Sequence, residues 1–173
     1  MIGAPPVVPE LDVSDLARSL AAYEGVLGFE CRVTRLEERF AYLVREGAHL
    51  MLQEAAGPGR RFRTAPLAPP FGRGVNLQIE VSDVDTLHAA VARSDLVIHV
   101  PLEERWYRQA DEEAGVRQFV VADPDGTLLR FGSDLGRRAV DKPEPPPDID
   151  LSASKARALP WTRQGEPPWT GFT

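Results

Sequence analysis

Apolar and polar residues alternate along two short segments of the chain. Polar residues separate Leu11 from Val13 in the first segment, and Leu77, Ile79 and Val81 from one another in the second. Successive side chains of a β-strand point to opposite faces. The pattern therefore predicts two strands, each with one apolar face.

The same tripeptide, Val-Ser-Asp, ends both predicted strands, at 13–15 and at 81–83. Serine and aspartate are preferred at helix N-termini, and the apolar residues behind each pair recur at helical spacing. These are Leu16, Leu20 and Tyr23 in the first half and Val84, Leu87 and Val91 in the second. The wider segments 10–22 and 78–90 align without a gap. The chain thus predicts an internal repeat of a strand followed by a helix.

Three further strands are predicted in each half. In the second half, Asp123-Pro124-Asp125-Gly126 is a strong turn signal, because proline presets one dihedral angle and glycine accepts a positive φ. The expected strands start at Phe29 and cover 40–45 and 48–53 in the first half, and cover 96–100, 117–122 and 127–131 in the second. We therefore predict an α+β fold of two βαβββ modules, 1–54 and 75–136.

Two segments fall outside the modules. Residues 55–74 form a linker rich in proline, glycine and arginine. Residues 137–173 form a tail with seven prolines between positions 143 and 168, which excludes helix and central sheet. Disorder of this tail and docking of its Trp161 and Trp169 on a surface both remain open.

Composition narrows the partners and the compartment. Hydrophobic residues make up 43% and charged residues 27%, and the formal net charge is −6. Without a basic stripe, no nucleic-acid or anionic-membrane partner is expected. The single cysteine, Cys31, excludes an internal disulfide and fits a reducing compartment. We see neither a signal peptide nor an apolar stretch of roughly 20 residues, so a cytoplasmic location is expected.

Three segments carry a resemblance to a known family. They are Val8-Pro9-Glu10-Leu11 with Asp15, Tyr23 to Phe29, and Phe119 to Phe131. With the repeated module, residues 7–135 resemble the vicinal-oxygen-chelate superfamily of glyoxalase I, extradiol dioxygenases, fosfomycin-resistance enzymes and bleomycin-resistance proteins. The resemblance implies a mixed sheet curled into a ligand cup, with helices on its convex side.

Strand alternation assigns side chains to the two faces of this sheet. The residues expected to face the helices are Leu11, Val13, Leu50, Leu52, Leu77, Ile79, Val81, Leu129 and Phe131. The opposite face would carry Val8, Glu10, Asp12, His49, Met51, Gln53, Asn76, Gln78, Glu80, Leu128 and Arg130. A face this polar is either an ordinary solvent-facing side or, as the resemblance implies, the cup.

Enzymes of the superfamily hold a divalent metal with His and Glu from the cup strands. The corresponding positions fall here on Val8, Met51, Asn76 and Arg130, which cannot form a hard-metal site. His49, His88 and His99 do not occupy these positions. We therefore expect no metal, no cofactor and no catalytic residue, and the chain is more typical of a binding protein than of an enzyme.

Bleomycin-resistance proteins lack the metal and sequester a cationic glycopeptide at a homodimer interface. The resemblance implies the same arrangement here, with the N-terminal strand exchanged between subunits. Acidic cup residues suit a cationic ligand and aromatic rings suit a planar one, whereas the four arginines 60, 61, 63 and 130 do not favour a cation. The candidate ligand-binding residues are Trp106, Tyr107, Glu10, Asp12, Met51, Gln53, Asn76, Gln78, Glu80, Arg130, Phe40 and Phe62.

Three functions remain open at this stage. The first is non-catalytic sequestration of a bleomycin-like or other aromatic, polar small molecule. The second is a metal-dependent lyase or dioxygenase with a displaced metal site that recruits His49, Glu10 or Glu80. The third is a paralogue whose ligand has diverged. Packing of Trp106 and Tyr107 in a core or an interface is the alternative to ligand contact.

Overall fold

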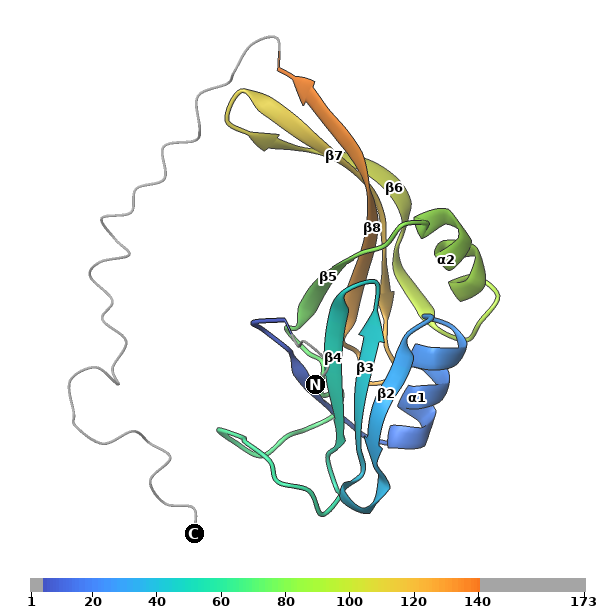
Figure 1. The fold of residues 1–173 in the computed structure, drawn as a ribbon, viewed down its shortest axis with the longest axis vertical. Coiled ribbons are helices and arrows are strands. Elements are labelled where there is room, and N and C mark those ends of the chain that lie inside the picture. Colours follow the sequence, from blue (N-terminus) through green and yellow to red (C-terminus); the bar gives the residue numbers. More distant parts are fainter. Residues whose placement is uncertain (1–4, 141–173) are drawn as a thin grey trace, which may run out of the picture.

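The computed structural model describes residues 5–140, which form two modules with the same order of strands and α-helix (Figure 1). The expected tail lies outside these residues from position 141 onward, and with it Trp161 and Trp169. The first module contains β1 (Glu10–Val13), α1 (Leu16–Gly25), β2 (Glu30–Arg35), the short 3-10 helix η1 (Leu36–Glu38), β3 (Phe40–Arg45) and β4 (Ala48–Glu54). The second contains β5 (Asn76–Glu80), α2 (Val84–Val91), β6 (Val97–Gln109), β7 (Glu112–Ala122) and β8 (Leu128–Ala139). The predicted βαβββ repeat is confirmed.

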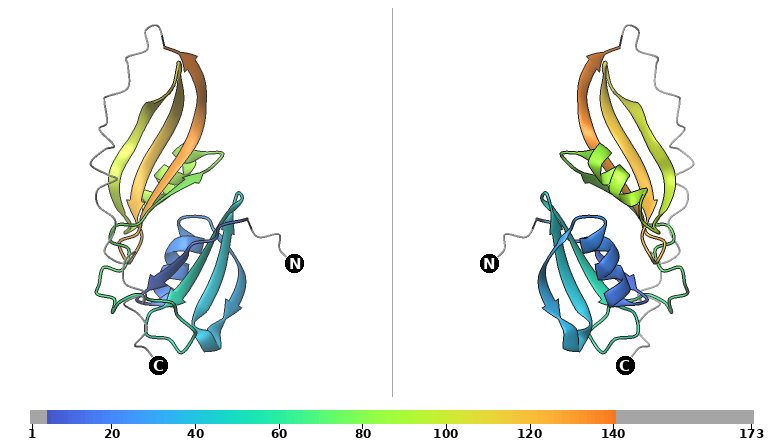
Figure 2. Two further views of the ribbon diagram at one scale, coloured as in Figure 1. Left: turned by 90° about the vertical axis from the view of Figure 1, so that its left-hand side faces the viewer. Right: turned by 90° about the vertical axis from the view of Figure 1, so that its right-hand side faces the viewer.

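Each module has its own four-stranded mixed sheet. The strand orders are β1-β4-β3-β2 and β5-β8-β7-β6, which are equivalent under the repeat. In both, the first strand runs parallel to the last, and the other neighbours are antiparallel. Among the described strands the eight form two separate sheets rather than one continuous ladder (Figure 2). Within the same residues, neither helix is long and apolar enough to cross a bilayer.

Both helices begin at the aspartate of the repeated tripeptide. The Asp15 carboxylate accepts a hydrogen bond from the Arg18 amide at 2.9 Å, and Asp83 accepts one from the Thr86 amide at 2.9 Å. Each bond satisfies a backbone donor that the first helical turn leaves free. The predicted caps are confirmed, and aspartate supplies both.

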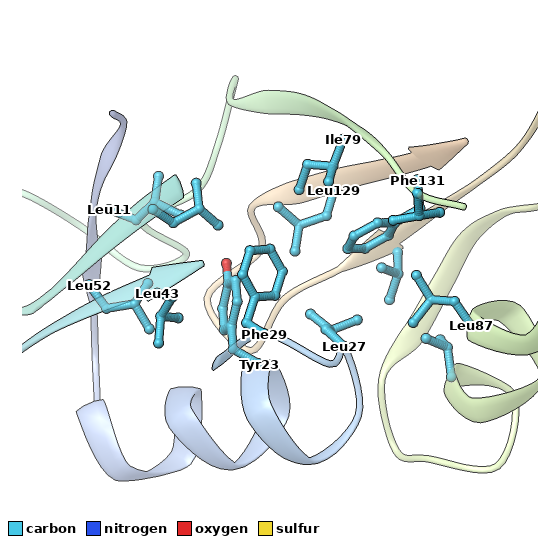
Figure 3. Close-up of a cluster of buried hydrophobic side chains, with 14 of the residues drawn as sticks. Leu11, Tyr23, Leu27, Phe29, Leu43, Leu52, Ile79, Leu87, Leu129 and Phe131 are labelled. Carbon is cyan, nitrogen blue, oxygen red and sulfur yellow. The ribbon is translucent and has the colours of Figure 1, made fainter. Parts of the chain in front are cut away.

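The apolar sheet faces and the two helices share one hydrophobic core. All nine residues expected to face the helices belong to it or pack against it. Side chains from the two modules lie side by side, with Phe29 and Leu27 of the first module next to Leu129 of the second (Figure 3). The modules therefore fold around a common interior, although their sheets are separate.

The turn between β7 and β8 is organised by Asp123. One oxygen of its carboxylate accepts the backbone N–H groups of Asp125 and Thr127, at 2.9 and 2.8 Å. The Asp125 carboxylate in turn accepts the amide of Ser14 from the first module, at 3.0 Å. Gly126 has the positive φ of 85° that the turn requires. The predicted turn is confirmed, and it also joins the two modules.

Three strands of the second module continue past α2 as an arm, made of residues 103–116 and 133–139 (Figure 1). The sequence predicts strands that end at residue 100 and restart at 117, and a tail from Arg137, but β6 runs to Gln109 and β8 to Ala139. Cross-strand pairing explains the difference. The Trp106 ring packs over Gly115 on β7, and the Arg138 guanidinium of β8 lies 4.1 Å from its centroid.

Candidate functional site

The candidate site is the sheet face opposite the helices, which we call the uncovered face. Each helix packs on one side of its own sheet, and neither helix covers the opposite face (Figure 1). In β1 and β5 its side chains alternate with the core residues, and Glu10, Asn76, Gln78 and Glu80 are exposed. The predicted division of the strands into an apolar and a polar face is therefore correct.

In the first module, strand register brings the candidate residues into two rows. Glu10 is paired with Met51, and Asp12 with Gln53. Phe40 of β3 is paired with Gln53 in the second row. Gln53 is buried, and its amide donates to the backbone carbonyl of Glu38 at 2.8 Å. It holds the start of β3 in place instead of presenting its amide to a ligand.

The second module repeats these rows with different chemistry. Gln78 is paired with Arg130, at the positions that Glu10 and Met51 hold in the first module. The Arg130 guanidinium donates a hydrogen bond to the Gln78 side-chain oxygen at 2.5 Å. Asn76 lies two residues before Gln78 on the same face. The repeat therefore places a cation where the first module has an apolar thioether.

Asp12 does not contribute free negative charge to the uncovered face. Its carboxylate forms a two-point ion pair with the guanidinium of Arg63, which comes from the linker. This pairing raises the pKa of Arg63, chiefly through the hydrogen bond to Asp12. The expectation of an acidic lining thus rests on Glu10 and Glu80.

A tyrosine–histidine pair on β3 and β4 was missed from the sequence. The hydroxyl of Tyr42 and Nδ1 of His49 share a hydrogen bond of 2.8 Å, with the two rings edge to face. Tyr42 is two residues from Phe40 in the predicted strand, so strand alternation places it on the uncovered face. The alternation of side chains along this strand could have indicated the position of Tyr42 from the sequence.

A groove of about 270 Å³ lies where the arm leaves the second sheet. Beside it, the buried amide of Gln118 donates to the Tyr107 hydroxyl at 2.8 Å and to Glu103 at 3.2 Å. The hydrogen bond from Arg105 lowers the pKa of Glu103. Glu103 is therefore ionised at neutral pH. The groove is lined by Gln78, Glu80, Ala114, Val116, Gly132, Ser133, Asp134 and Arg137.

The four aromatic candidates do not converge on one site. Trp106 and Tyr107 are neighbours in β6, so their side chains point to opposite faces of the arm, and only Tyr107 reaches Gln118. Phe40 is buried, with the Arg35 guanidinium 3.9 Å from its ring centroid. Phe62 is 76% exposed on the linker. Among these four, Tyr107 is linked to the groove through Gln118, which is paired with Gly132 of the groove lining.

A larger cavity, about 470 Å³, lies on the helix side between α1 and the segment 94–97. Its buried ionisable group is Asp123, and burial raises the pKa of this carboxyl. Both carboxylate oxygens already accept hydrogen bonds from Tyr23, Asp125 and Thr127. Asp123 therefore stabilises the turn and has no oxygen left free for a ligand in this cavity.

The residues on the uncovered face do not fit a divalent metal. Met51 and Arg130 occupy equivalent register positions, and neither a thioether nor a guanidinium is a ligand for a hard cation. Between residues 5 and 140, no three His, Cys, Asp or Glu side chains are grouped so that they could hold a metal.

Comparisons with known proteins agree with this fold. The profile of the Glyoxalase/Bleomycin resistance protein/Dioxygenase superfamily matches residues 7–131. No curated protein matches the chain.

Several solved structures are similar to the chain. TioX from Micromonospora sp. ML1 is 24% identical with a TM-score of 0.60, over 76% of this chain and 100% of that one. Virulence protein STM3117 from Salmonella typhimurium is 20% identical with a TM-score of 0.57, over 77% of this chain and 98% of that one. A protein of unknown function from Agrobacterium tumefaciens is 27% identical with a TM-score of 0.56, over 78% and 98% of the two chains. The repeated module, its turn signature and the profile match together show that the chain belongs to the glyoxalase/bleomycin resistance protein/dioxygenase superfamily.

Proposed function

We propose that this protein binds a polar, aromatic small molecule on the uncovered face without transforming it, in the manner of the bleomycin-resistance proteins. The observation that carries the proposal is the donor chemistry of that face. Arg130 and Met51 occupy the positions at which metal-dependent relatives place ligands, and a groove of about 270 Å³ opens beside Gln78. The face has polar groups and space for a ligand, but no residue set for metal catalysis.

The charges at the groove favour a ligand with at least one cationic group. Glu80, Asp134 and Arg137 line the groove, so two carboxylates face one guanidinium there. The Tyr107 ring, which is 42% exposed, adds an aromatic surface. An amphipathic ring that is half open to solvent suits stacking on a planar group.

The proposed binding unit is a homodimer acting in the cytoplasm. Each chain presents two separate sheets whose uncovered faces are open, and a second copy would close them into a cup. Sedimentation velocity at micromolar protein concentration tests this part. A single species at the mass of one chain would contradict it.

The binding proposal is tested by calorimetric titration with bleomycin. We expect saturable binding at micromolar concentration, and a several-fold weaker affinity for Glu80→Gln because a facing negative charge is lost. Glu37→Gln in η1 removes the same charge from an exposed site away from the groove and should leave the affinity unchanged. If no saturable heat is seen with wild-type protein, bleomycin is excluded as the ligand.

The displaced-metal alternative receives no support from the described geometry. His49 is engaged by Tyr42, and neither Glu10 nor Glu80 joins a group of metal-ligating side chains within residues 5–140. Elemental analysis of the purified protein tests it directly. A stoichiometric divalent metal that chelation removes together with ligand binding would favour the enzyme.

A further inference from the structure

Among the residues that the structure describes, Arg130 is a cation without an anionic partner on the uncovered face. Its hydrogen bond there goes to the neutral amide oxygen of Gln78. Within residues 5–140, no carboxylate lies within 4.0 Å of its guanidinium nitrogens. The Nε atom is buried and has no hydrogen-bond partner in this part of the chain. A guanidinium carries five donors, so most of its hydrogen-bonding capacity is unused here.

The first module shows how this chain otherwise treats charge on the same face. There the Asp12 carboxylate is matched by Arg63, which reaches it from the linker with two nitrogens. Arg130 has no such carboxylate partner in the described part of the chain. Gln78 fixes the direction of the guanidinium but leaves its positive charge in place.

The surroundings of Arg130 restrict what can approach it. It is paired with Gln78 on one side and with Val120, which is buried, on the other. Gln78 also lines the groove, together with Glu80 and the apolar side chains of Ala114 and Val116. Arg130 is joined to this groove through Gln78, and the charged residues of the groove itself are Glu80, Asp134 and Arg137.

The geometry points to Arg130 as the anchor for an anionic oxygen group, a carboxylate, sulfonate or phosphate, on the molecule bound at the uncovered face. This inference rests on the proposed binding function and specifies the ligand further. The planar fork of a guanidinium matches the paired oxygens of such groups, and these charge-assisted bonds are stronger than neutral ones. The ligand class is therefore a zwitterionic aromatic molecule, with an anionic group at Arg130 and a cationic group toward Glu80.

Two fluorescent probes with the same aromatic skeleton test this anchor on the full chain. 8-Anilinonaphthalene-1-sulfonate carries a sulfonate, and N-phenyl-1-naphthylamine is its neutral counterpart. We expect wild-type protein to bind the sulfonate about tenfold tighter, the factor that one charge-assisted hydrogen bond supplies. Arg130→Gln should weaken sulfonate binding about tenfold and leave the neutral probe unchanged.

Matched variants distinguish loss of the Arg130 contact from a change in net charge and from loss of the fold. Arg93→Gln, at an exposed position after α2, removes one positive charge away from the site and should change neither affinity. Arg130→Lys keeps the charge without the fork and should fall between wild type and Arg130→Gln. Thermal unfolding of each variant shows whether the fold is retained.

A direct readout is the Nε–H resonance of Arg130, assigned by its loss in Arg130→Lys. It should shift on titration with the sulfonate probe and stay unchanged with the neutral one. A shift with inorganic phosphate at lower concentration than with the sulfonate would identify a free inorganic anion as the recognised group. Equal wild-type affinity for the two probes, or equal loss of both in Arg130→Gln, would overturn the anchor. The bleomycin titration decides the proposed function independently.

Discussion

The hydroxyl of Tyr23 donates a buried hydrogen bond of 2.9 Å to the carboxylate of Asp123, 100 residues further along the chain. Tyr23 is in α1 of the first module, and Asp123 opens the β7–β8 turn of the second. Because the two sheets share no ladder within the described residues, contacts of this kind set how the modules lie against one another.

Removing this hydroxyl should destabilise the whole fold. Tyr23→Phe leaves a buried carboxylate with one donor fewer, so we expect a loss of about 1–3 kcal/mol in the free energy of unfolding. Urea denaturation at neutral pH measures it. Tyr107→Phe removes a hydroxyl from the exposed arm and should cost less, and an equal loss in both variants would contradict the special role of Tyr23.

The same pair predicts a loss of stability in alkali. Burial, followed by the charge of Asp123, raises the pKa of Tyr23 well above its ordinary value. A group whose pKa is higher in the folded state stabilises fully below its unfolded pKa, and this stability is lost as the pH rises through the folded pKa. The stability should therefore decline above about pH 10. Denaturation curves collected across this range should show a shallower decline for Tyr23→Phe than for wild type, and parallel slopes would refute the prediction.

Truncation in the common core should affect both modules at once. Leu129 is fully buried in β8 and lies in the cluster that joins the modules (Figure 3). Leu129→Ala is expected to lower the free energy of unfolding by about 2–5 kcal/mol, through lost burial and the cavity left behind. Leu36→Ala, at a side chain that is 71% exposed, is the matched control and should change little. Hydrogen exchange that speeds up only in β5–β8 of the Leu129 variant would show that the core is not shared.

The packing of the Trp106 ring in the arm requires a residue without a side chain at position 115. A Cβ atom there would lie 2.7 Å from Cη2 of Trp106, so the ring would have to move off β7. Gly115→Ala should cost about 1–3 kcal/mol locally, as overpacking does. Hydrogen exchange in the arm should accelerate while the sheets stay protected. Gly25→Ala, where no atom lies within 4 Å of the added Cβ, should not accelerate it.

The local elements could be read from the sequence because they depend on neighbours a few residues apart. Alternation around Leu11 and Ile79 assigned the strand faces, and the Ser-Asp pairs located both helix starts. The turn between β7 and β8 could be predicted for the same reason, because its backbone geometry depends on the residue types of Asp123-Pro124-Asp125-Gly126.

Contacts between distant segments were decided by the tertiary structure. Composition cannot show that Arg63 neutralises Asp12, that Trp106 covers Gly115 on a continuing strand, or that Arg130 lacks an acidic partner among the described residues. These contacts form only when segments far apart in the chain are brought together, because each side chain's interactions depend on the residue that lies opposite it. The sequence alone determined the repeat and its two-faced strands, while the charge pattern of the uncovered face and the arm required the fold.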